Sequence, residues 1–244
     1  MIDNPQIFVM YGSGMFGTFI TTLFSHHPDA ETMSLNKEIS GDEDGVNAHN
    51  DYKRQLDNFH DYHDYYNIEK MNHKEKVNFF KPLKEKNIGI HRFSGYLFAD
   101  FPFDDHFKNY VKIIMIAKEE GYTRYAKRHV EVGGTNVKET RKEWWESLSN
   151  KPINKLPWVF VKGMKIKEKE KVIKTEINDY LNKNIIDPQH DIVFDPDDIQ
   201  DINKLQGLVD QCCKMLKIKS FTLPKQKIER FVDLNKNYFD KISK

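Results

Sequence analysis

The segment that most constrains the fold is residues 7–24, with the sequence IFVMYGSGMFGTFITTLF. A short apolar run leads into Gly12, Gly14 and Gly17, and an apolar-periodic stretch follows, which predicts a strand, a glycine turn and a helix. A helix start of this kind presents backbone N–H groups and the positive end of the helix dipole. The segment therefore predicts a site that binds a phosphate or sulfate group.

The composition limits the kind of protein that carries this turn. The 244 residues include 38 basic and 37 acidic side chains, so the formal net charge is only +1. A general nucleic-acid binder shows a strong basic excess, and we therefore expect no nucleic-acid partner. No apolar run reaches the roughly 20 residues that span a bilayer, and the first residues do not resemble a signal peptide. We expect a cytoplasmic protein that does not associate with membranes.

Apolar runs and helical periodicities alternate along the rest of the chain. Strands are predicted at 88–93, 111–117, 157–161 and 190–196, and helices at 120–130, 138–149, 165–183 and 201–218. The aromatic segment 95–107 is predicted to be a loop. Because helices supply the crossovers that parallel strands need, we predict an α/β, three-layer, P-loop-like fold with a central, mostly parallel sheet flanked by helices. We expect a single domain over 1–244, with a helical insertion near 46–86 and a C-terminal helix at 225–242.

Two other groups of reactive side chains are interpreted as structural. The histidines and aspartates of residues 60–64 share a helix face, but no second cluster at ligand spacing completes a metal site, so we predict no bound metal. Cys212 and Cys213 are adjacent in an apolar helical stretch, where they cannot easily bridge each other. We interpret both as thiols of the core.

The glycine turn is compatible with several kinds of site. Residues 12–17, GSGMFG, fit the dinucleotide-binding pattern GxGxxG, but no second strand with an acidic end stands about 20 residues on. Against the nucleotide-hydrolase pattern GxxxxGK[ST], Thr18 replaces the lysine and Phe19 replaces the hydroxyl residue. A sulfuryl-transfer site keeps the loop without needing a metal to hold a triphosphate. A glycine turn with no ligand is the remaining alternative.

Four segments resemble, in order, those of the P-loop sulfotransferase family, whose enzymes move a sulfuryl group from 3'-phosphoadenosine-5'-phosphosulfate to a hydroxyl or amine. Residues 11–28 resemble the 5'-phosphosulfate loop, 88–93 the strand that brings a basic residue or histidine to the site, 111–129 the strand and helix that hold the 3'-phosphate, and 190–218 the late strand, acidic turn and helix. The resemblance implies a nucleotide-binding transferase whose partners are this small-molecule donor and an unknown acceptor, with no metal.

The resemblance also implies roles for individual residues. His91 and Arg92, placed at the end of a short apolar strand, are candidates for the catalytic base and cation. The residues expected to bind the donor are Gly12, Ser13, Gly14, Gly17, Thr18, Lys118, Arg124 and Arg128.

Two departures from the family pattern leave the activity open. Gly12 stands where the family commonly has a Lys or Arg, and Ala126 stands where it usually has a serine. Lys118 keeps one cation, but as a point charge without the fork of an arginine. Arg124 and Arg128 share a helix face and could substitute. A sulfotransferase-like enzyme and a binding or structural protein on the same fold therefore both remain candidates.

Overall fold

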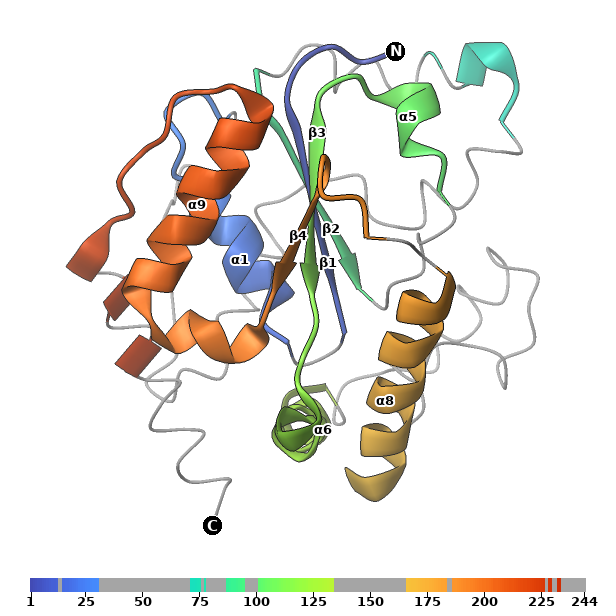
Figure 1. The fold of residues 1–244 in the computed structure, drawn as a ribbon, viewed down its shortest axis with the longest axis vertical. Coiled ribbons are helices and arrows are strands. Elements are labelled where there is room, and N and C mark those ends of the chain that lie inside the picture. The colour runs from blue at the N-terminus through green and yellow to red at the C-terminus, as the bar shows by residue number, and fades with distance from the viewer. Residues whose placement is uncertain are drawn as a thin grey trace.

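Four parallel strands form the centre of the molecule in the order β2-β1-β3-β4 (Figure 1). The computed structural model describes residues 1–12, 15–30, 71–75, 77, 87–94, 101–133, 166–183, 186–226, 228–229 and 232–233. The strands are β1 (Gln6–Tyr11), β2 (Gly89–Ser94), β3 (Tyr110–Met115) and β4 (Asp191–Phe194). The expected parallel sheet is confirmed, with strand ends that differ by one or two residues from the sequence ranges. The strand expected at 157–161 and the helix expected at 138–149 lie outside the described residues.

Helices cover both faces of this sheet and give the predicted three layers (Figure 1). One face is covered by α1 (Gly17–Phe24) and α9 (Ile202–Leu216), and the other by α5 (Phe103–His106) and α8 (Ile166–Lys183). Helix α6 (Tyr122–Gly133) lies beyond the carboxyl ends of the strands and packs against α8. Two 3₁₀ helices follow β3 and β4, namely η2 (Glu119–Gly121) and η5 (Pro196–Gln200). Most of the expected insertion 46–86 and of the expected C-terminal helix 225–242 lies outside the described residues.

Helix α5 corrects the loop expected over 95–107. The side chains of Phe103 and Phe107 are buried, and their ring centroids each lie 4.9 Å from the ring of Phe8 in β1. A proline and two aspartates made this segment look like a loop, whereas burial of aromatic rings against the sheet stabilises one helical turn.

Strand β1 is buried along its whole length. All six of its residues are buried, and it pairs in register with β2 on one side and β3 on the other. A parallel strand covered on both faces is expected to be a continuous apolar run, which is why the sequence identified it. Helix α9 adds a buried stripe that includes Cys212 and Cys213, both free thiols, as expected.

Gly17 lies where α1 begins and lets this helix approach the end of β1 closely. A Cβ atom built at Gly17 would lie 1.9 Å from Cδ1 of Tyr11. Gly207 is the opposite case, because it lies in α9 and a Cβ atom there would meet no atom within 4 Å.

We expect Gly17→Ala to lower the free energy of unfolding by about 1–3 kcal/mol, the usual cost of inserting a methyl group into a packed region. The matched control Gly207→Ala should raise it by about 0.5–1 kcal/mol, because alanine favours a helix more than glycine does. Urea denaturation followed by circular dichroism measures both changes. Wild-type stability of Gly17→Ala would contradict the close approach to Tyr11.

Candidate functional site

The candidate site lies where the carboxyl ends of β1 and β3 meet. The chain proceeds from β1 to β2 on one side of the sheet, and from β3 to β4 on the other. Tyr11 and Met115 are partners in the register of these two strands, so the residues that follow them leave the sheet side by side. Ligands of open parallel sheets bind in the crevice at such a switch point. The turn after β1 and residues 116–121 follow the two strands at this switch point, and we refer to the region between them as the switch-point crevice.

The turn after β1 directs the start of α1 toward the crevice. The carbonyl of Gly12 accepts a hydrogen bond from the N–H of Met15 at 3.1 Å, and Phe16 has a left-handed backbone with φ 60°. This conformation is uncommon for a residue with a side chain. Phe16 is the N-cap residue and makes no side-chain cap hydrogen bond. The first-turn amides have no acceptor within the helix, and their dipole favours an anion. Ser13, Gly14 and the side chain of Thr18 lie outside the described residues.

Two of the cations expected to bind the donor are bound to carboxylates of the turn after β4. The Nζ atom of Lys118 lies 2.9 Å from Oδ2 of Asp195. The guanidinium group of Arg124 donates to Asp197, whose other oxygen accepts the hydroxyl of Tyr125. The hydrogen bond to Asp195 raises the pKa of the Lys118 ammonium above its ordinary value. Both positive charges at this side of the crevice are therefore compensated within the protein.

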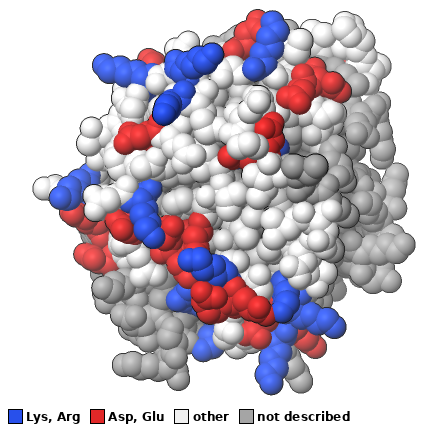
Figure 2. All heavy atoms as spheres, in the orientation of Figure 1, with Lys and Arg blue, Asp and Glu red and all other residues white. Residues whose placement is uncertain are grey.

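Further ion pairs extend this network to neighbouring helices. Lys204 at the start of α9 pairs with Asp198, and Lys174 of α8 pairs with Glu119 of η2. Figure 2 shows blue and red side chains interleaved along the lower part of the visible face, not gathered into a basic patch. A strongly anionic partner such as a nucleic acid would find no uniform positive surface on this face.

His91 lies inside the sheet and not at its carboxyl edge. It is the third residue of β2, its ring stacks on Phe8 at 4.6 Å between centroids, and it is only 1% exposed. Its Nε2 donates to Oε1 of Gln6 at 2.7 Å, and Gln6 is the first residue of β1. His91 and Arg92 were predicted near the end of a strand over 88–93, whereas β2 extends to Ser94 and has His91 as its third residue. These contacts with Phe8 and Gln6 are those of a residue packed in the core.

The other expected site residues are only partly described. Arg92 lies in β2 and Arg128 lies in α6, but their side chains are outside the described part of the structure. The structure thus places Gly12, Gly17 and Lys118 around the switch point and puts His91 elsewhere. Sequence reasoning missed the carboxylates that bind the two cations. The acid-rich stretch DPDDIQD at 195–201 was the available signal for them.

Two findings concern the described residues alone. No group of three or more His, Cys, Asp or Glu side chains among them is arranged to hold a metal ion. The cluster at 60–64 lies outside this part of the chain. In the same described part, none of the helices combines the length and apolar character needed to cross a bilayer.

Comparison with known proteins assigns no family to this chain. The chain matches no protein-family model and no curated protein. A solved structure, the sulfotransferase domain from the curacin biosynthetic pathway, is similar at a TM-score of 0.40 and 12% sequence identity, over 93% of this chain and 77% of that chain. At this level of similarity the α/β assignment rests on the parallel sheet observed in this chain itself.

Three buried tyrosines are expected to lower the stability of the folded protein at alkaline pH. Burial is the largest cause that raises the pKa values of Tyr110, Tyr125 and Tyr180 above the ordinary value of 10.0, and Asp197 raises that of Tyr125 further. The folded protein therefore keeps protons that the unfolded chain releases. The stability from these groups is complete below pH 10 and decreases as the pH rises toward their folded pKa values.

We expect the free energy of unfolding to fall steadily above about pH 10, by about 1.4 kcal/mol per pH unit for each of these tyrosines. Urea denaturation at successive pH values measures this decrease, and absorbance at 295 nm reports tyrosine ionisation. The 11 tyrosines should then titrate in two groups, the buried ones only as the protein unfolds. Reversible ionisation of all of them near pH 10 with intact circular dichroism would contradict the assignment.

Proposed function

We propose that the switch-point crevice binds the phosphate or sulfate group of a small nucleotide. We further propose that the protein is a sulfotransferase-like enzyme that uses 3'-phosphoadenosine-5'-phosphosulfate and a hydroxyl or amine acceptor. The observation that carries the proposal is the register of β1 with β3, in which Tyr11 pairs with Met115. Segments that resemble the 5'-phosphosulfate loop and the 3'-phosphate strand therefore lead into one crevice, although they are about 100 residues apart in the sequence.

The residues present fit this donor in part. The turn from Gly12 and the start of α1 suit one anionic group, because they combine a close backbone approach with the positive end of a helix. Lys118 is near enough to the crevice to serve a second anionic group, but it is paired with Asp195. When bound, the donor supplies the sulfuryl group and its phosphate leaving group. The contribution of this chain is to bind and orient the donor. The buried His91 is not proposed as the base.

A non-catalytic binding or structural protein on the same fold is the second candidate. Two observations favour it, namely the burial of His91 and the pairing of Lys118 and Arg124 with carboxylates. A dinucleotide-binding protein has less support. Among the described strands, β2 is the next after β1, and it ends at Ser94 without an acidic residue.

We expect adenosine 3',5'-bisphosphate, the donor without its sulfuryl group, to bind the wild-type protein with micromolar affinity. Gly14→Val should weaken this binding by about tenfold or more, because a branched side chain keeps a phosphate away from the backbone amides. Isothermal titration calorimetry measures both affinities.

The control is Gly207→Ala, which changes a glycine of α9 outside the crevice and should bind as the wild type does. Circular dichroism verifies that both variants are folded. Absence of binding to the wild type at millimolar nucleotide would exclude the proposed donor.

A further inference from the structure

Asp195 is fixed in place at the carboxyl end of β4. Its Oδ1 accepts the N–H of Asp197 at 3.0 Å, so its carboxylate caps η5. The Asp195 side chain is 12% exposed, whereas that of its partner Lys118 is 66% exposed. The acid is therefore held by the fold, while the lysine is a long, exposed side chain. A pair with one exposed partner contributes a modest free energy, and an anionic ligand must overcome this free energy to take Lys118 from Asp195.

The second pair in this region is less accessible. Asp197 binds the Arg124 guanidinium and the hydroxyl of the buried Tyr125 at the same time, and the side chains of both Asp197 and Arg124 are about one quarter exposed. The guanidinium also lies over the Tyr125 ring, 5.7 Å from its centroid. Of these two cations, Lys118 is therefore the more accessible to a ligand.

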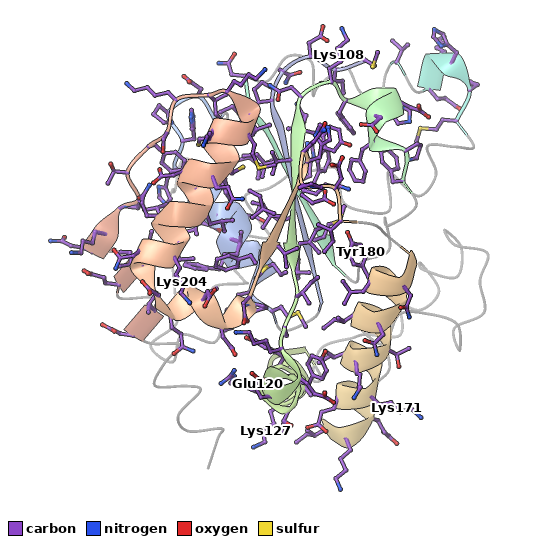
Figure 3. All side chains as sticks on the ribbon, in the orientation of Figure 1. Lys108, Glu120, Lys127, Lys171, Tyr180 and Lys204 are labelled. Carbon is purple, nitrogen blue, oxygen red and sulfur yellow. The ribbon has the colours of Figure 1, made fainter. Side chains whose placement is uncertain are left out.

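The charges around Lys118 disfavour an anion beside it. Asp195 and Asp198 face Lys118 from the turn after β4, and Glu120 lies nearby on η2. Lys204 is the neighbouring cation on this side and is itself paired with Asp198, so the acids keep the excess around Lys118. Figure 3 shows Glu120 at the end of the molecule where the strands point, with Lys108 at the opposite end. A second anionic group of a ligand would have to displace one carboxylate from Lys118 and remain close to the others.

On the basis of the proposed function, we propose that Asp195 is a specificity-determining residue that weakens binding of a ligand's second phosphate by occupying Lys118. The first phosphate at the turn after β1 is unaffected, because it is bound by backbone amides and not by Lys118. The wild-type protein therefore gains little affinity from a 3'-phosphate. It should distinguish adenosine 3',5'-bisphosphate only weakly from adenosine 5'-monophosphate, which lacks that group.

The test compares these two nucleotides in the wild type, Asp195→Asn and Asp201→Asn by calorimetry. Asparagine keeps an oxygen that can cap η5 but removes the charge, so Lys118 becomes available. In Asp195→Asn the affinity ratio of bisphosphate to monophosphate should rise by about threefold or more, the range that one exposed ion pair supplies. Asp201 caps α9 in the same way, through the amides of Asn203 and Lys204, and is the control with the same change of charge.

Each outcome decides the proposal. An affinity ratio that rises in Asp195→Asn and not in Asp201→Asn supports the proposal. Asp195→Ser, which also keeps a capping oxygen, should show the same rise. An unchanged ratio in a protein that binds both nucleotides overturns the role of Asp195 and leaves the proposed function intact. An equal rise in Asp201→Asn shows a general effect of charge and overturns it as well. Failure of every variant, Asp195→Asn included, to bind either nucleotide overturns both proposals.

Discussion

The pairing of β1 with β3 is the interaction on which the rest of the structure depends. It places a strand with six buried residues at the centre of the sheet and brings Tyr11 beside Met115. The two segments that follow these strands are far apart in the sequence. They become neighbours through the parallel register of β1 and β3. The crevice and the start of α1 are positioned by this register, and the pairing of β4 with β3 adds the charged turn beside them. Loss of the β1–β3 pairing would separate the glycine turn from Lys118 and Arg124.

The electrostatics of the crevice are governed by internal ion pairs. A glycine turn and a helix start attract an anion, but Lys118 and Arg124 face Asp195 and Asp197 of the same protein. The start of α1 therefore supplies positive potential, whereas the charges of Lys118 and Arg124 are offset by their carboxylate partners. This division is the basis of the proposal that the crevice binds one phosphate group and gains little affinity from a second one. It also explains why both an enzyme and a binding protein remain consistent with the fold.

Among the described residues, the sequence predicted all four strands and the longer helices, because local patterns of apolar residues indicate which of their residues are buried. β1 is a continuous apolar run, and α9 repeats buried residues at helical spacing. Helix α5 was missed because its stability comes from contact with Phe8, which is distant in the sequence.

The site was predicted less well for the same physical reason. The partner of His91 is Gln6, 85 residues away, so spacing could not show that this histidine is buried and hydrogen-bonded. Arg124 was correctly placed on a helix, but its carboxylate partner lies 73 residues further along the chain. Single-sequence reasoning finds glycine turns and periodic faces, whereas the compensation of a charge is a property of the folded chain.

A crystal structure of the protein with adenosine 3',5'-bisphosphate tests the central claim most directly. The account predicts the 5'-phosphate on the backbone amides that follow β1, in the crevice between β1 and β3. It also predicts that Asp195 remains within hydrogen-bond distance of Lys118. A nucleotide bound elsewhere, or a 5'-phosphate held only by side chains away from this turn, would contradict the account.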